Sequence, residues 1–475
     1  MRFIPVSARG ISQISYLIGD DSTGEAAVID PRPDCEIYLR LSEKHGLSIT
    51  HLFETHIHAD FMSGARELAA RLGGRPAICA SGEGDAEYGF DLERLADGDH
   101  FEFGATRLTV RHTPGHTPEH IAFELAEKER PDSPWGVLTG DSLFVGSAGR
   151  PDLLDDDQTE ELAEKLFRTL REYYLGLDDG VMIFPCHGAG SACGADIGDR
   201  PMSTIGYERR FNDFLQYDDL NEFKKFVIDG APPQPAHYSR LKKVNSRGPE
   251  IIGGLPKCPG LPADAFREVI DEDGVTLLDT RDMHAFGGGH IPGAINIGDR
   301  PMLSNWAGDM LDPEHELLLV MDDDRQIEEI VRYLWRVGIT RFRGYLAGGM
   351  KSWNRKGWPL NRIEQVTVDE LNEHRDEWQT LDVRAPSEWK EGHVPGAVHH
   401  YVAEMRDGVD ELDGFSRDKT TAVYCGSGYR ASIAASMLEQ AGYSDVRNVP
   451  GSWEAWTERD LPVSHEHTED DEEKE

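Results

Sequence analysis

The sequence lacks several features that would define other classes of protein. No apolar run reaches the length of a membrane span, and the start of the chain holds no signal-peptide core. Only 6 cysteines are scattered over 475 residues, without a CxxC pair. Their scarcity argues against a disulfide framework and against a structural zinc site. We therefore expect a cytoplasmic protein of about two to four domains.

Basic residues are also scarce, with 49 Lys and Arg against 87 Asp and Glu and a formal net charge of -38. This balance argues against nucleic acid or an anionic membrane as partner, because phosphate groups are bound by clustered Lys and Arg. Two explanations stay open: a halophilic-like adaptation to a high-salt cytoplasm, and an ordinary acidic protein. The acidic tail, 466–475, is predicted to be disordered.

The first part of the chain alternates strand-like and helix-like segments. "SITHLFETH" reads as a strand that ends in a histidine motif, and "GARELAARLGG" has helical apolar spacing with a glycine stop. The strand-like runs "RLTVRHTPGH", "WGVLTGDSLF" and "VMIFPCHG" each end at a His, an Asp or a glycine-rich turn. Polar residues at strand ends, on loops, are how an αβ/βα sandwich builds a metal site.

The second half of the chain repeats itself. "LLDTRDMHAFGGGHIPGAINI" aligns without gaps with "TLDVRAPSEWKEGHVPGAVHH", so that Asp279 matches Asp382 and His290 matches His393 at one constant offset. Such a register indicates a tandem duplication of a small α/β domain with a parallel sheet. The segment 231–261, rich in Pro, Gly and basic residues, predicts a linker. The expected parts are 1–245, a linker at 246–262, two repeats at 263–362 and 363–465, and the tail.

The motif "THIHADFMSG" places His56, His58 and Asp60 at alternating positions. With "HTPGHTPEH", "LTGDSLF" and "FPCHGAG" following in order, this part of the chain resembles the metallo-β-lactamase superfamily. The resemblance implies two metal positions, one of which uses Asp60, the next residue and His187. The next residue here is Phe61, which offers no lone pair. We therefore expect a mononuclear centre.

Within that superfamily, the motifs and the segment "GSAGRPDL" resemble the persulfide dioxygenases. The resemblance implies one Fe(II) per chain, since two imidazoles and one carboxylate suit ferrous iron and dioxygen. The implied iron ligands are His56, His116 and Asp141. The implied groups that orient these ligands and water are His58, Asp60 and His187. Arg150 either meets the carboxylate of a thiol substrate or pairs with Asp152 and shapes the loop.

In the second repeat, the strand "TTAVYC" ends at Cys425 and is followed by "GSGYRAS", which opens a helix. Backbone N–H groups, the helix N-terminus and Arg430 all favour a thiolate there, so Cys425 should be reactive. With "DVR" and "EGHVPGA", this repeat resembles the rhodanese family, whose cysteine carries a persulfide. The persulfide loop would consist of Gly426, Ser427, Gly428 and Tyr429.

The first repeat departs from this pattern, because Asp322 stands where the second has Cys425. It therefore should not carry sulfur, and spacing, docking or regulation are its expected roles. In the first part of the chain, Cys193 either receives sulfur near the iron or only packs.

The expected function is the oxidation of a low-molecular-weight thiol persulfide with O2 to sulfite, coupled to rhodanese transfer between persulfide, sulfite and thiosulfate in sulfide detoxification. One alternative is a thioester hydrolase like glyoxalase II, with two metals and a sulfurtransferase appendage. The other is a non-catalytic sulfur-relay or redox-sensing scaffold. No nucleic acid and no membrane is expected as partner, and a homo-oligomer is compatible with the sequence.

Overall fold

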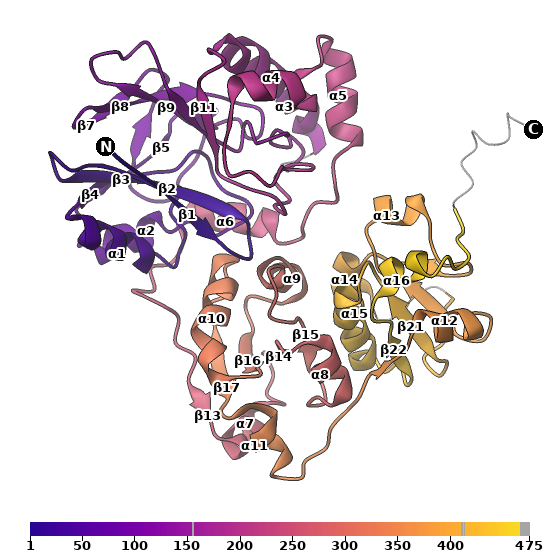
Figure 1. The fold of residues 1–475 in the computed structure, drawn as a ribbon. Coiled ribbons are helices and arrows are strands. Elements are labelled where there is room, and N and C mark those ends of the chain that lie inside the picture. The colour runs from indigo at the N-terminus through magenta and orange to yellow at the C-terminus, as the bar shows by residue number, and fades with distance from the viewer. Residues whose placement is uncertain (154–155, 410–411, 413, 466–475) are drawn as a thin grey trace, which may run out of the picture. The chain divides into compact units, whose positions relative to one another are not determined.

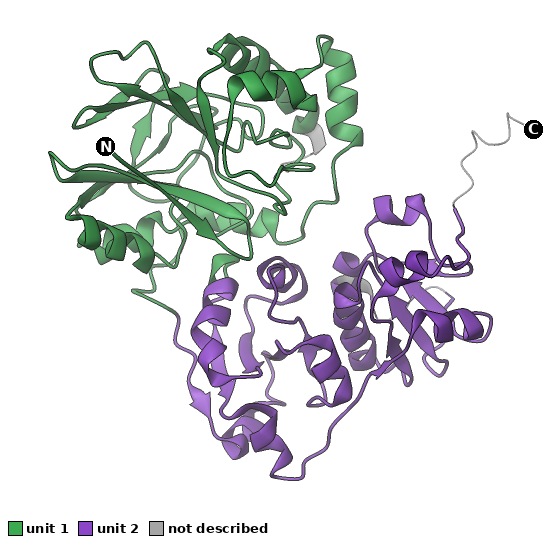
Figure 2. Ribbon diagram, in the orientation of Figure 1, with its two compact units in different colours: residues 1–255, 335–338 green, residues 256–334, 339–475 purple. Residues whose placement is uncertain are grey.

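The computed structural model describes the whole chain except residues 154–155, 410–411, 413 and 466–475. The predicted acidic tail therefore lies outside the described residues. The chain divides into two compact units, residues 1–255 with 335–338 and residues 256–334 with 339–475 (Figure 2). The second unit holds both predicted repeats except residues 335–338, which group with unit 1.

Unit 1 is built on two six-stranded sheets (Figure 1). The strands of the first sheet, in spatial order, are β1 (Arg2–Ala8), β2 (Gln13–Asp20), β3 (Glu25–Ile29), β4 (Ser48–Phe53), β5 (Ala77–Ser81) and β6 (Glu93–Leu95). Those of the second are β12 (Ser203–Thr204), β11 (Met182–Pro185), β10 (Gly136–Gly140), β9 (Ile121–Glu127), β8 (Thr106–His112) and β7 (His100–Phe103).

The two sheets pack face to face over one apolar core to which both contribute, for example through Phe53, Leu108 and Phe123. The outer face of the first sheet is covered by α1 (Glu36–His45) and α2 (Ala65–Arg71). The outer face of the second is covered by α3 (Asp156–Arg168), η1 (Thr169–Tyr173), η2 (Tyr174–Gly176), α4 (Ile205–Phe211), η3 (Asp213–Leu215) and α5 (Leu220–Asp229). This arrangement confirms the predicted αβ/βα sandwich.

The interpretation of 231–261 as a linker is wrong for its middle, which forms α6 (Tyr238–Arg247). Tyr238, Leu241 and Asn245 are buried at helical spacing, so this helix packs against the sandwich despite its own basic residues and the Pro-rich segment before it. Its Asn245 amide donates to the carbonyls of His58 and Phe61, both at 2.7 Å, and accepts from the Ser63 N–H at 2.9 Å. The helix thereby fixes the loop that carries the HxHxD motif.

Replacing Asn245 with alanine should lower the free energy of unfolding of unit 1 by roughly 2–4 kcal/mol, because it leaves two buried carbonyls and one N–H without partners. Chemical denaturation followed by tryptophan fluorescence measures the change. Lys243→Ala, at an exposed position of the same helix, is the matched control. Equal stability of the two variants would mean that the loop does not depend on α6.

Unit 2 contains two five-stranded parallel sheets. In the first repeat, the strands in spatial order are β13 (Gly260–Leu261), β17 (Phe342–Leu346), β16 (Glu316–Val320), β14 (Val275–Asp279) and β15 (Ile295–Asn296). In the second they are β18 (Glu364–Gln365), β22 (Val446–Asn448), β21 (Thr421–Tyr424), β19 (Gln379–Asp382) and β20 (Val398–His399). The two orders correspond strand for strand, as expected for a duplication.

Each repeat also has its own set of helices. The first has α7 (Ala263–Val269), α8 (Met283–Gly288), α9 (Leu303–Met310), η4 (Asp324–Gln326), α10 (Ile327–Arg336) and α11 (Gly349–Asn354). The second has α12 (Val368–His374), α13 (Pro386–Glu391), η5 (Val402–Glu404), α14 (Met405–Gly408), α15 (Tyr429–Gln440) and α16 (Ser452–Glu458). Both repeats are thus the small α/β domains that the sequence predicts.

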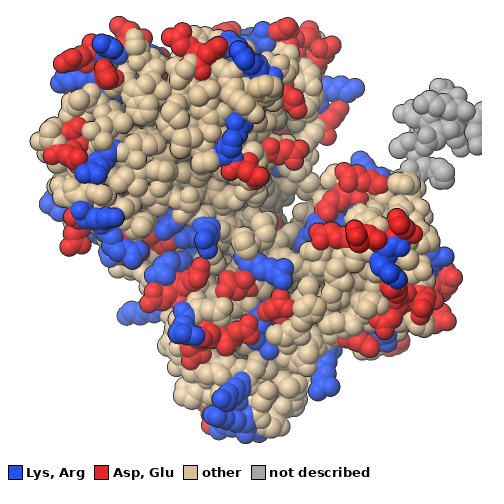
Figure 3. Space-filling view, in the orientation of Figure 1, with Lys and Arg blue, Asp and Glu red and all other residues tan. Residues whose placement is uncertain are grey.

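Among the described residues, no helix combines the length and the apolar character needed to cross a membrane. On the face drawn in Figure 3, acidic and basic side chains of the described residues are interspersed. No continuous basic field appears on that face, in keeping with the net charge of -38.

Candidate metal centre and sulfur-transfer loop

The polar motif residues of unit 1 gather at one end of the sandwich because each follows the end of a strand. His56 comes shortly after β4, Asp141 directly after β10 and His187 shortly after β11. His116 lies on the loop that follows β8. All four side chains are buried, with at most 2% of their surface exposed. Residues far apart in the sequence therefore share one enclosed site.

His56, His116 and Asp141 bring one potential ligand atom each to within 4.8 Å of one another. The Nε2 atoms of His56 and His116 lie 3.8 Å and 3.6 Å from Oδ2 of Asp141. Within the described part of the chain, His56 Nε2 and both carboxylate oxygens of Asp141 have no hydrogen-bond partner. Since buried polar atoms are costly when unpaired, this donor set fits a metal ion.

Neighbouring groups orient the rings of His56 and His116 so that the Nε2 atom of each points toward Asp141. Nδ1–H of His116 donates to the carbonyl of Arg150 at 2.9 Å, and Nδ1 of His56 lies 2.9 Å from the hydroxyl of Thr55. Each contact leaves Nε2 free to bind a metal. Burial lowers the pKa of His116 to about 3 and that of His56 well below its usual value. Both rings are therefore neutral, as metal ligands must be.

A further histidine, which the sequence analysis missed, positions the carboxylate. His120 Nε2 accepts the backbone N–H of Asp141 at 2.9 Å, so its Nδ1 carries the proton and donates to the hydroxyl of Thr113 at 2.8 Å. Burial raises the pKa of Asp141 to about 6. The signal was present as the third histidine of "HTPGHTPEH", but only the fold shows which backbone group it holds.

His58 belongs to a different group of polar side chains from His56, together with Asp30 and Glu54. Its Nε2 lies 3.1 Å from carboxylate oxygens of both Asp30 and Glu54. Burial opposes protonation of this ring, but the two carboxylates outweigh it and raise the pKa of His58 to about 10. His58 is thus a charged partner of two acids that the sequence analysis did not single out, at the ends of neighbouring strands.

Asp60, His187 and Cys193 form a second group beside the first, again with ligand atoms within 4.8 Å of one another. His187 Nε2 lies 3.1 Å from Oδ2 of Asp60. Burial raises the pKa of Cys193 to about 12, so this thiol stays protonated at neutral pH. Phe61 is fully buried, with its ring 4.3 Å from that of His58. An apolar ring thus occupies the position where a second metal would need a histidine.

Arg150 is 4% exposed and its guanidinium is engaged by the protein itself. Nε and one terminal nitrogen bind the carboxylate of Asp152 at 2.8 Å and 2.5 Å, and the same terminal nitrogen donates to the carbonyl of Pro232. These contacts favour the alternative in which Arg150 shapes its loop. A cavity of about 210 Å³ next to it is lined partly by the apolar Phe214 and Phe226.

In unit 2, Cys425 follows β21 directly and is 1% exposed. Its Sγ accepts the N–H of Gly428 at 3.1 Å, and its own N–H donates to the hydroxyl of Ser452 at 3.1 Å. Three N–H groups near the start of α16 hold the carbonyls of the loop: Gly451 binds Ser427, Trp453 binds Cys425 and Glu454 binds Gly426. The loop is therefore fixed around the sulfur.

The first repeat has Asp322 exposed at the corresponding strand end, after β16. Other residues of this repeat contact the helix that carries the loop of the second. The Tyr429 hydroxyl donates to the carbonyl of Gly298 at 2.9 Å, and the Ser432 hydroxyl donates to Oδ1 of Asn296 at 2.6 Å. The first repeat thus helps to position α15 without providing a thiol at Asp322.

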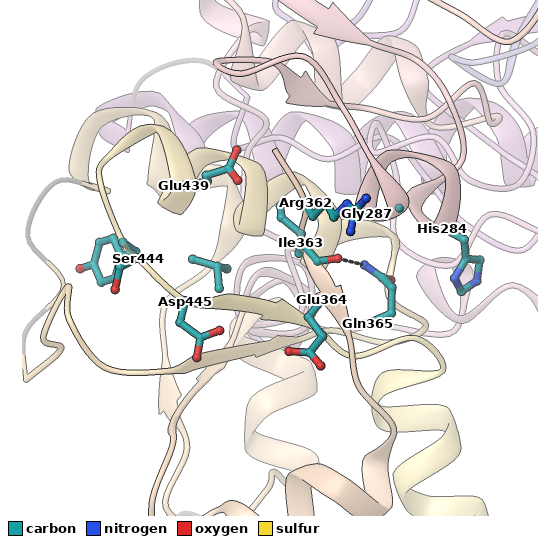
Figure 4. Close-up of a pocket in the computed structure, with 12 residues that line it drawn as sticks. His284, Gly287, Arg362, Ile363, Glu364, Gln365, Glu439, Ser444 and Asp445 are labelled. Carbon is teal, nitrogen blue, oxygen red and sulfur yellow. Dashed lines mark hydrogen bonds between the residues drawn. The ribbon is translucent and has the colours of Figure 1, made fainter. Parts of the chain in front are cut away.

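A cavity of about 520 Å³ lies elsewhere in unit 2 (Figure 4). Its wall includes the acidic Glu364, Glu439 and Asp445 and the basic Arg362, and a hydrogen bond of 3.1 Å joins Gln365 to the carbonyl of Ile363. None of the residues lining this cavity belongs to the group of His56, His116 and Asp141 or to the Cys425 loop.

Comparison with known proteins agrees with a sandwich followed by two repeated domains. The sequence pattern of the metallo-beta-lactamase superfamily matches residues 9–187, and that of the rhodanese-like domain matches residues 262–356 and 367–459. Persulfide dioxygenase ETHE1, mitochondrial, of Bos taurus is 29% identical over 234 residues, which cover 49% of this chain and 83% of that protein. Hydroxyacylglutathione hydrolase GloC of Haemophilus influenzae is 30% identical over 234 residues, covering 45% of this chain and 97% of that protein.

Among solved structures, a metallo-beta-lactamase from Staphylococcus aureus superposes with a TM-score of 0.65 at 34% sequence identity. The match covers 72% of this chain and 98% of that one.

Proposed function

The chain belongs to the metallo-β-lactamase superfamily and carries two rhodanese-like domains, and from this premise we propose that it is a persulfide dioxygenase joined to a sulfurtransferase. The observation that carries the proposal is the group of His56, His116 and Asp141, in which His56 Nε2 and both Asp141 carboxylate oxygens have no hydrogen-bond partner among the described residues. Phe61 stands next to Asp60, where a second metal would need a histidine. Relatives named persulfide dioxygenase support the same assignment.

The donor set suits one ferrous ion, since two imidazoles and one carboxylate leave open positions. Iron bound there would supply the binding and activation of dioxygen beside the substrate sulfur. The chain contributes the geometry: Thr55 and the Arg150 carbonyl orient the two rings, and His120 orients Asp141. The buried rings of Phe61 and Phe144 lie 6.5 Å and 6.2 Å from the ring of His187, so the surroundings of His187 are partly apolar.

The proposed substrate is the persulfide of a low-molecular-weight thiol. In the overall reaction the persulfide, O2 and one water give the thiol and sulfite. The Cys425 thiolate would then exchange sulfane sulfur among persulfide, sulfite and thiosulfate, supported by the N–H of Gly428 and the start of α15.

A second candidate, a thioester hydrolase with two metals, is supported by the group of Asp60, His187 and Cys193 and by relatives named hydroxyacylglutathione hydrolase. Metal content separates the candidates. We expect about one iron per chain in active enzyme. Two tightly bound zinc ions, together with thioester hydrolysis, would replace the dioxygenase assignment.

The decisive experiment is aerobic incubation of the purified protein with a low-molecular-weight persulfide while oxygen uptake, sulfite and thiosulfate are followed together. Oxygen uptake matched by sulfite or thiosulfate is expected. A protein that holds no metal and turns over neither persulfide nor thioester would instead be a sulfur-relay or redox-sensing scaffold.

Replacing Asp322 with alanine should leave the rates of oxygen uptake and sulfur transfer within about twofold of wild type, because this exposed carboxylate cannot form a persulfide. Steady-state rates for both reactions provide the measurement. A large fall in thiosulfate formation would show that the first repeat takes part in the chemistry.

A further inference from the structure

The basic side chain of Arg430 lies at the start of α15, directly after the Cys425 loop. A cation at this position would ordinarily attract an anionic substrate to the loop. An ideal Cβ on Gly426 would lie 3.1 Å from a terminal nitrogen of Arg430. The guanidinium therefore lies directly over the backbone of the residue that follows the nucleophile.

Both terminal nitrogens of Arg430 are bound by Glu388 on α13, at 2.5 Å and 2.8 Å. Oε2 of Glu388 also accepts the N–H of Ala385 at 3.0 Å, which holds the carboxylate in place. Burial opposes ionisation of Glu388, but the hydrogen bonds from Arg430 outweigh it and lower the pKa of this carboxyl. The bidentate pair thus cancels the charge of the loop arginine.

The neighbouring arginine is neutralised in the same way. Arg384, which stacks over the ring of Trp453 at 4.4 Å, binds the carboxylate of Asp382 at 2.6 Å. The loop itself offers a negatively charged group the N–H of Gly428 and the positive end of α15. These suffice for the single charge of a thiolate or persulfide, whereas the second charge of a dianion would meet an Arg430 whose charge Glu388 already balances.

We propose that Glu388 sets the charge selectivity of the Cys425 loop, so that it takes sulfur from persulfides of low charge in preference to the thiosulfate dianion. The inference rests on the proposed sulfurtransferase function and specifies its donor. In the transfer, the Cys425 thiolate attacks the outer sulfur of the persulfide and forms the new S–S bond. The old S–S bond breaks, and the thiol leaves with the electron pair and takes up a proton.

The test compares two sulfur donors, thiosulfate and the persulfide of 2-mercaptoethanol, with cyanide as acceptor and full-length protein. Glu388→Gln keeps the shape and the carbonyl that binds Arg430 but removes the negative charge. Its KM for thiosulfate should fall about tenfold, as expected for one charge interacting with a dianion in a partly buried site. The KM for the persulfide, which carries at most one charge, should fall by clearly less than that, and both kcat values should change by less than about twofold.

Two further variants separate charge from packing. Glu388→Asp retains the charge and should keep the thiosulfate KM near that of wild type, while Glu391→Gln removes an exposed carboxylate of the same helix and should have no effect. Three outcomes would overturn the inference about charge selectivity but not the sulfurtransferase proposal. They are an unchanged thiosulfate KM in an active Glu388→Gln enzyme, an equal loss of activity with both donors, and identical KM values for the Asp and Gln variants. A wild type that transfers sulfur from neither donor would overturn the sulfurtransferase proposal as well.

Discussion

Replacing Cys425 with serine is expected to abolish sulfur transfer from any donor to a thiol or to cyanide. Serine preserves the shape of the loop between β21 and α15 but offers a hydroxyl that stays protonated at neutral pH. Oxygen uptake with persulfide should persist, because the proposed iron ligands belong to unit 1 and Cys425 to unit 2. The product should therefore shift from thiosulfate toward sulfite.

Cys258→Ser is the matched control, since it removes a half-buried thiol in unit 2 outside the loop. It should leave both reactions near wild type. If Cys425→Ser stopped oxygen consumption as well, the cysteine would be an obligate carrier that delivers the persulfide to iron. The two sites would then catalyse consecutive steps of one reaction. The hypothesis that each site works without the other would be wrong.

Replacing His116 with alanine should remove both the metal and oxygen uptake. The variant loses one of three proposed ligands from a buried group and leaves the Arg150 carbonyl without its imidazole donor. Metal analysis of the purified variant should find iron reduced at least about tenfold, and an oxygen electrode should detect no persulfide-dependent uptake. Sulfur transfer at Cys425 should be intact.

His112→Ala provides the control, because His112 lies near His116 in the sequence but binds the carbonyl of Pro118 and is not one of the grouped potential metal ligands. It should retain iron and oxygen uptake. Full iron content in His116→Ala would contradict the proposed ligand set and point to a different group of residues as the centre.

Much of the architecture is readable in the sequence because it depends on local patterns. The strands within "SITHLFETH" and "VMIFPCHG" are recognisable because each is an apolar run that stops at a polar turn. The constant register of the repeats predicts two equivalent sheets. The α6 helix was missed because a Pro-rich stretch precedes it and the helix itself is rich in basic residues, while its buried positions have partners only in the folded sandwich.

The sequence by itself determined the chemistry that each site can have, since Phe61 has no lone pair, Asp322 has no thiol and Cys425 opens a loop before a helix. Only the tertiary structure decided how these groups are partnered. His58 faces Asp30 and Glu54, His120 holds the backbone of Asp141, and Arg430 is bound by Glu388. The reason is physical: residue type fixes which bonds a side chain can make, but the nearest partner of a buried polar group is set by which distant segments the fold packs against it.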